Sequence, residues 1–180
     1  YDYGRGGGPI AMYRLHRGLR KAGVDSKLLC KYKKLESPES VAIPRSFVSA
    51  RLEPRLGQLL SRFGLNDIHC LSTFKIQGLR AYQEADLLDF HGIHGGYFNY
   101  LALPSLTAHK PAILTLHDMW HLTGHCMYSY DCERWKSGCG QCPYPESYPP
   151  VRKDNTRIEW KLKNWVYQRS QLTVVTPSSW

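Results

Sequence analysis

Three short apolar runs in the second half of the chain constrain its fold more than any other feature. They are ADLLDFH at 85–91, PAILTLH at 111–117 and LTVVT at 172–176. Runs of this length are typical of buried strands, and helical patterns separate them at 96–106 and from Asn155 or Thr156 to Ser170. Alternating strands and helices predict an open parallel sheet with helices on both faces. We therefore expect an α/β, Rossmann-like fold that binds its ligand outside the carboxyl ends of the strands.

The first half of the chain gives weaker signals. Pro9–Ala22 predicts a helix, with proline in its first turn and a glycine after its end. Val24–Lys31 predicts a short strand, 36–50 a loop, and Ala50–Phe63 a second helix. The helix that follows Asn155 is expected to point these residues inward: Ile158, Leu162, Trp165 and Val166.

Composition limits the class of protein. Hydrophobic residues make up 42% of the 180 residues and charged ones 22%, which is typical of a globular chain. No apolar run approaches the roughly 18 residues of a membrane span, and no secretory signal pattern opens the sequence. The chain lacks an initiator methionine, opens on Tyr-Asp-Tyr-Gly and stops shortly after an apolar run, so we expect it to be truncated at both ends.

The net charge of +9 is concentrated near the first predicted helix, and only Asp25 opposes it there. Such a basic field favours anionic partners: phosphorylated substrates, an acidic membrane surface or nucleic acid. A merely solvated face is the alternative. The basic residues are Arg14, Arg17, Arg20, Lys21, Lys27, Lys31, Lys33 and Lys34.

Histidines follow two of the predicted strands. His91 and His94 come at the end of ADLLDFHGIH, and His117-Asp118 ends PAILTLHD. Because the carboxyl ends of parallel strands meet at one edge, we expect these side chains to share a rim, although a single such histidine is more often structural.

His117, His121 and His125 would share a face only if residues 117–125 were helical. The strand-like PAILTLH and the interruption at Gly124 argue against that helix. The zinc-protease signature His-Glu-x-x-His is not met either, because Asp118 stands where glutamate is required.

Four of the six cysteines lie close together, at Cys126, Cys132, Cys139 and Cys142. A CxxC pair with two further thiolates nearby fits tetrahedral structural zinc, which can hold an irregular loop together. His125 could replace one of these ligands, and disulfides or free thiols are the alternatives. Four thiolates leave no open position, so we do not expect a catalytic zinc.

A glycine-rich segment, Gly4-Arg-Gly-Gly-Gly8, leads directly into the first predicted helix. Glycines allow close approach of a ligand, and a helix N-terminus offers free amides to a phosphate or sugar oxygen. The spacing matches neither the Walker nor the dinucleotide pattern, and a plain tight turn is the alternative.

Together these segments resemble the N-terminal half of a family 4 glycosyltransferase of the two-Rossmann GT-B type, and within it the bacterial enzymes that build exopolysaccharides such as colanic acid. The resemblance covers nearly the whole chain, more loosely over 36–80. It rests on GRGGGPIAMYRLHRGLRKAGVDSKLL, ADLLDFHGIHGGYFNYLALP, PAILTLHDMWHLTGHCMYSYDCERWKSGCGQCP and DNTRIEWKLKNWVYQRSQLTVVTPSSW. Gly8-Pro9 departs from the small residues expected in the loop.

The resemblance implies a hexosyltransferase-type enzyme that moves a sugar from a nucleotide-sugar donor to a hydroxyl, with retention of configuration. His117, with Asp118 beside it, would reach the donor sugar as the catalytic pair, and His91 and His94 would be substrate-binding. Gly6, Gly7 and Gly8 would lie against donor or acceptor. An imidazole at a strand end can orient a sugar while its anomeric carbon gains positive charge.

The resemblance also implies a division of labour between two domains. Residues 1–180 correspond to the acceptor-side domain, with a Cys-rich insertion at about 119–155. The donor-binding domain, which supplies a Glu-x7-Glu pair, has no counterpart here, because no two glutamates have that spacing. We therefore expect the chain alone not to turn over.

The expected partner is a glycan or lipid-linked acceptor in cell-surface polysaccharide synthesis. The expected location is cytoplasmic, with the basic helix of Arg14, Arg17 and Arg20 at the anionic inner face of the plasma membrane. Two alternatives remain: a zinc-stapled nucleic-acid-binding module, which no recognised motif supports, and a metallohydrolase that uses His91, His94, His117 and His121.

Overall fold

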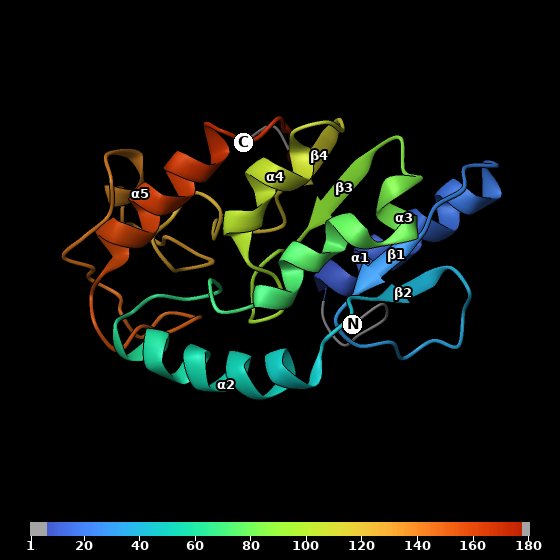
Figure 1. The fold of residues 1–180 in the computed structure, drawn as a ribbon. Helices are drawn as coiled ribbons and strands as arrows, with labels where there is room; N and C mark the ends of the chain where they lie inside the picture. Colours follow the sequence, from blue (N-terminus) through green and yellow to red (C-terminus); the bar gives the residue numbers. More distant parts are fainter. Residues whose placement is uncertain (1–6, 178–180) are drawn as a thin grey trace.

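The computed structural model describes residues 7–177. Within this range the strands form two small parallel sheets (Figure 1). β1 (Leu28–Cys30) pairs with β2 (Ser40–Ala42), and β3 (Leu88–His91), β4 (Ala112–Thr115) and β5 (Thr173–Val175) form the second sheet in that order. The parallel pairing and the intervening helices confirm the expected α/β class, with the strands divided between two sheets.

Helices connect the strands. The α-helices are α1 (Gly7–Lys21), α2 (Phe47–Arg62), α3 (Arg80–Gln83), α4 (Leu103–Thr107) and α5 (Thr156–Tyr167). Short 3₁₀ helices lie at Leu71–Gly78 (η1), Tyr100–Ala102 (η2) and Arg134–Lys136 (η3). In Figure 1, α2 runs along one edge of the molecule, whereas α4 lies beside β4 and α5 lies beyond α4.

The core sits between β4, α4 and α5. Leu114 of β4, Leu103 and Leu106 of α4 and Val166 of α5 are all buried, and Trp120 of the following loop is completely enclosed beside them. Burial of these apolar side chains drives the packing of α4 and α5 against the larger sheet.

Several expected elements differ in extent. The predicted strand Val24–Lys31 is reduced to β1, and the predicted loop 36–50 contains β2. The predicted helix 96–106 starts only with η2 and continues as α4, because Gly95 and Gly96 have positive φ angles of 85° and 75°. These left-handed residues break the helical backbone before Asn99, whose side chain then accepts the N–H of Leu101.

α5 shows a different inward face from the expected one. Ile158 and Trp165 are about half exposed, and of the four predicted inward residues Val166 is fully buried. The residues that α5 buries are mainly polar: Thr156, Glu159 and Lys163. These groups make hydrogen bonds that a purely apolar pattern does not reveal.

The segment between β4 and α5 is irregular, as expected. In this part of the chain, all of which the structure describes, η3 is the one regular element. Over residues 7–177, no helix is both long and apolar enough to cross a bilayer.

Candidate functional site

The two predicted strand ends place their histidines in contact. His91 is the last residue of β3 and is paired in register with Thr115 at the end of β4, two residues before His117. Nδ1 of His91 lies 2.9 Å from Nε2 of His117, and the two rings stack with their centroids 5.2 Å apart. The carboxyl edge of the larger sheet therefore carries a hydrogen-bonded histidine pair.

Asp89 extends this pair into a chain of three. Its Oδ2 lies 3.0 Å from Nε2 of His91, and its Oδ1 accepts the Thr115 hydroxyl at 3.4 Å. Side chains two apart on a strand share a face, so Asp89 and His91 point to the same side of the sheet. We did not single out Asp89 from the sequence, although the Asp-x-His spacing at a strand end was the available signal.

These contacts couple the tautomers of the two rings. A neutral His91 that directs its Nε2–H at the Asp89 carboxylate presents a lone pair at Nδ1. His117 must then donate from Nε2, which leaves its own Nδ1 as an acceptor. Burial lowers the pKa of His117, and the neighbouring His91 lowers it further, so the ring is neutral at pH 7.

His94 and Asp118 form a second pair beside the first. Nε2 of His94 lies 3.0 Å from Oδ2 of Asp118, whose other oxygen accepts the Trp120 N–H at 2.9 Å. Burial tends to raise the pKa of Asp118, but the hydrogen bonds from His94 and Trp120 outweigh it and the pKa is lowered. Asp118 is therefore a carboxylate at pH 7. The structure thus brings all four predicted rim residues together.

The glycines behave differently from the expectation. Gly6 lies outside the described residues. Gly7 and Gly8 form the first turn of α1, so the helix starts before Pro9 rather than after a loop. A Cβ built on either glycine would meet no atom within 4 Å. No other described part of the chain therefore requires glycine at these two positions.

Lys163 of α5 holds the loop that carries Asp118. Its Nζ donates to the carbonyls of Trp120 at 2.8 Å and Thr123 at 3.0 Å, and lies 3.4 Å from the centre of the Trp120 ring. The side chain is buried, and that burial lowers the pKa of Lys163 to about 8. We did not predict this contact, because the 40 residues between the partners conceal it in the sequence.

Comparison with known proteins places the chain in a family. A family model described as Glycosyltransferase Family 4 matches residues 5–180. The chain belongs to glycosyltransferase family 4. One curated relative is the putative colanic acid biosynthesis glycosyl transferase WcaC of Escherichia coli, which is 39% identical over 75 residues. The match covers 38% of this chain and 18% of that protein. No solved structure shows a significant match.

The other two histidines of the loop have separate environments in this family 4 chain. Residues 117–125 form turns rather than a helix, which confirms that their regular spacing does not define one face. Nδ1 of His121 contacts the Tyr167 hydroxyl at 3.1 Å, and burial lowers the pKa of His121 to about 3. Nδ1 of His125 donates to the Pro149 carbonyl at 2.8 Å.

The cysteine loop shows no metal site. Among residues 7–177, no group of three or more His, Cys, Asp or Glu side chains is placed to hold a metal ion, and the cysteines form no disulfide there. Sγ of Cys142 lies 3.3 Å from Nε2 of His125, and Sγ of Cys139 accepts the Gly124 N–H at 3.2 Å. Zinc on Cys126, Cys132, Cys139 and Cys142 therefore stays a prediction of the sequence alone.

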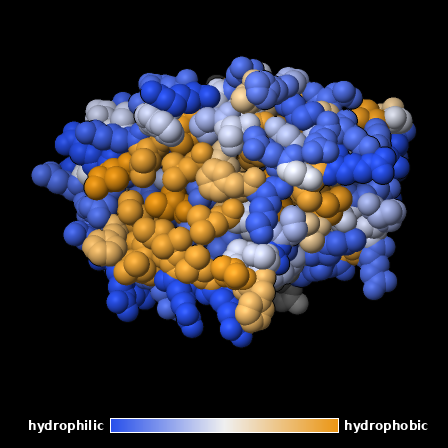
Figure 2. All heavy atoms as spheres, viewed as in Figure 1, coloured by the Kyte–Doolittle hydropathy of each residue, from blue (hydrophilic) through white to orange (hydrophobic). Residues whose placement is uncertain are grey.

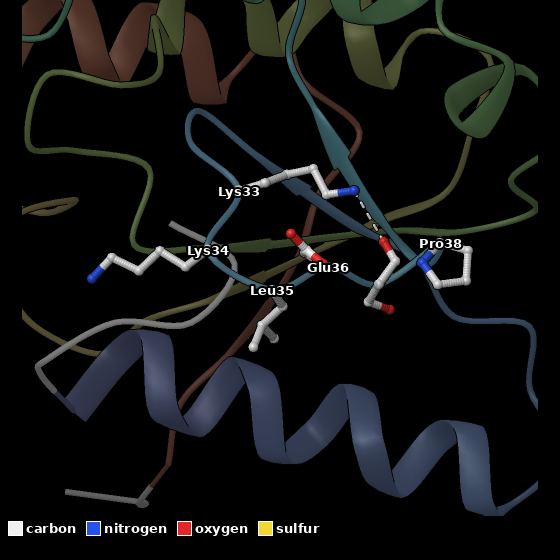
Figure 3. A pocket seen from close by; sticks show the side chains of 6 residues that line it. Lys33, Lys34, Leu35, Glu36 and Pro38 are labelled. Atoms are coloured by element: carbon white, nitrogen blue, oxygen red, sulfur yellow. Dashed lines mark hydrogen bonds between the residues drawn. The ribbon is translucent and has the colours of Figure 1, made fainter.

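Two surface hollows of this family 4 chain are lined by residues other than His91, His94, His117 and Asp118. One, of about 450 Å³, is lined by residues 33–38, where Lys33 donates to the Ser37 carbonyl at 3.1 Å (Figure 3). The other, of about 480 Å³, lies along α1 between Ile10 and Lys21. Neither contains a rim residue.

Proposed function

We propose that this protein transfers a sugar from a nucleotide-sugar donor to a glycan or lipid-linked acceptor in cell-surface polysaccharide synthesis, with retention of configuration. Membership of glycosyltransferase family 4 supports the reaction type, and the name of the colanic acid relative supports the pathway class. The observation that carries the proposal is the Asp89–His91–His117 chain at the carboxyl edge of the sheet.

His117 is the residue we assign to the donor sugar. Its Nδ1 is an acceptor, so it can take a hydrogen bond from a sugar hydroxyl and fix the orientation of the ring. Being neutral, the imidazole does not repel the positive charge that develops at the anomeric carbon. The carboxylates of Asp89, which lies behind His91, and of Asp118 both stabilise the positive charge at the anomeric carbon.

His91 has a supporting role in this proposal. Both of its ring nitrogens already face partners, Asp89 on one side and His117 on the other. We therefore assign it to positioning His117, whereas the sequence suggested direct substrate binding. His94 similarly holds the Asp118 carboxylate.

The test is the His117→Ala variant of the protein as its gene encodes it. Radiolabelled UDP- and GDP-sugars are incubated with protein and bacterial lipid extract, and label transferred to lipid or glycan is measured. We expect turnover to fall by about 100-fold, the typical effect of removing one preorganised polar group from such a site. NMR of the product then reads whether the anomeric configuration of the donor is retained.

The matched control is His109→Ala. His109 is exposed and precedes β4, whereas His117 follows it, so the variant removes an imidazole from the opposite end of the same strand. Its activity should equal that of the wild type. Equal activity of His117→Ala and wild type would overturn the proposed role of the histidine chain.

A further inference from the structure

α2 and its C-cap residue Phe63 carry several large apolar side chains on the outside of the molecule. Val48, Leu52, Leu59 and Phe63 are 68%, 46%, 51% and 48% exposed. At 3.6 residues per turn, these positions fall within about 60° of one another around the helix. Figure 2 shows a broad hydrophobic area over the side of the molecule where α2 lies in Figure 1.

The opposite face of α2 is polar and fixes this orientation. The buried residues of α2 are Ser49 and Glu53. Oε1 of Glu53 accepts the Ser72 N–H at 2.6 Å, and its Oε2 lies 3.4 Å from Nε of Arg45. At Gly57 a Cβ would come within 3.0 Å of the His69 ring, so the helix lies close to its neighbour there. Turning the leucines inward would break these contacts and bury the arginines.

Basic residues flank the apolar stripe. Arg51, Arg55 and Arg62 are exposed, and their positions lie beside Val48 and Leu59 around the helix. Glu53, the sole acidic residue of α2, is buried beside Arg45. The neighbouring η1 adds two exposed apolar side chains, Leu71 and Phe74, and one exposed lysine, Lys75. An apolar stripe with uncompensated positive charge is typical of helices that lie in a membrane interface.

We propose that α2, with η1 beside it, docks this protein on an anionic lipid surface. The leucines and Phe63 enter the boundary between headgroups and acyl chains, while Arg51, Arg55 and Arg62 contact lipid phosphates. Charge complementarity favours lipid over a second copy of the chain, because two copies of α2 would bring like charges together. Docking does not require the transfer reaction, so it is testable independently of the proposed function.

This inference moves the membrane contact from the first helix to the second. The sequence suggested Arg14, Arg17 and Arg20 of α1, but Arg20 is engaged with Asp25 at 2.6 Å and Glu39 at 3.3 Å. α1 also presents Leu15 as its one large exposed hydrophobic residue among those described, whereas α2 presents Phe47, Val48, Leu52 and Leu59. Both an apolar and a basic component are needed for stable interfacial binding.

The experiment is co-sedimentation of the full-length protein with vesicles of phosphatidylcholine alone or with about 30% phosphatidylglycerol as the anionic lipid. We expect binding to the anionic vesicles. Leu52→Ser with Leu59→Ser should weaken the partition coefficient at least about tenfold, because each exposed leucine loses its contact with the acyl region. The triple variant R51Q, R55Q, R62Q should weaken it on the order of 100-fold at low salt.

The matched control is the double variant R14Q, R17Q on α1, which should bind as the wild type does. Circular dichroism and urea unfolding establish that each variant is folded, and the substituted side chains are exposed. Undiminished binding of the leucine variant would overturn the proposal. Loss of binding in the α1 variant alone would also overturn it. So would a wild-type protein that binds no vesicles and forms a dimer, if the leucine variant were monomeric.

Discussion

Asp89 is the residue whose role is most open to a direct test. Its carboxylate orients His91, which orients His117, so Asp89→Asn should disturb the tautomer chain without removing any ring. We expect kcat to fall about tenfold, which is typical when a residue that hydrogen-bonds a functional histidine is replaced. KM should change little. The acidic limb of the pH–rate profile should move, since the charge that supports the pair is lost.

Asp86→Asn is the matched control for that prediction, because Asp86 is exposed and lies just before β3 on the same segment. Asp89→Glu should recover part of the activity. A fall in kcat with an unchanged pH profile would mean that Asp89 serves only the fold.

At the scale of single residues, the sequence predicted the rim and missed its connections. His91, His94, His117 and Asp118 could be placed because strand ends follow from apolar runs. The contact between Asp89 and His91, and the one between Lys163 and Trp120, depend on side-chain directions that a single sequence leaves open. The assignment of His117 to the donor sugar came from the family resemblance, and the strand-like character of PAILTLH argued against a helical face shared with His121 and His125.

At the scale of elements, α5 and the histidine loop act as one unit through Lys163. Lys163→Met keeps the volume of the side chain but leaves the carbonyls of Trp120 and Thr123 without their donor. Glu159, which accepts Tyr100 Oη–H at 2.8 Å, also loses a nearby positive charge. We expect the free energy of unfolding to fall by about 3 kcal/mol, measured in urea.

Lys161→Met is the comparison, because Lys161 is exposed on the same helix. It should change the unfolding free energy by less than about 0.5 kcal/mol. Equal effects of the two substitutions would show that the buried lysine does not hold the loop.

Elements with strong apolar periods were predictable, and those set by tertiary contacts were not. β3, β4, β5 and α5 lie where their patterns placed them. β2 is three residues long and depends on pairing with β1, so no local hydrophobic alternation predicts it. The outward orientation of the α2 leucines was equally hidden, because periodicity shows that a helix has two faces and does not show which one is buried.

At the scale of the whole molecule, buried histidines make stability depend on pH. Burial is the first cause of the lowered pKa of His16, His69, His117, His121 and His125. The unfolded chain therefore binds protons below pH 6.5 that the folded chain resists. The contribution of these histidines to stability is present above pH 6.5 and is lost as the pH falls towards the folded pKa values, which for His121 is about 3.

His121 should contribute up to about 1.4 kcal/mol per pH unit to this loss. Urea unfolding at pH 7.5, 6.5 and 5.5 should show the decline, and His121→Asn should flatten it while lowering stability at pH 7.5. His109→Asn should leave the slope unchanged, because His109 is exposed. A wild-type stability that is level across these pH values would contradict the prediction.

The overall class was predictable because it needs only the order of strands and helices. Parallel pairing follows from strands joined through helices, and the carboxyl edge then follows from chain direction. The division into two sheets could not be foreseen, since it depends on the packing of the segment from β2 to β3, where clear hydrophobic periods are few.

The register of β3 and β4 determines whether the histidine pair can form. His91 faces Thr115 in the ladder, and the histidine pair exists only in that alignment. A slip of one residue would turn one imidazole to the opposite side of the sheet. Distant substitutions that loosen the packing of α4 against β4 should therefore abolish activity before they unfold the protein. A shift in strand register separates the two imidazole rings while the rest of the fold persists.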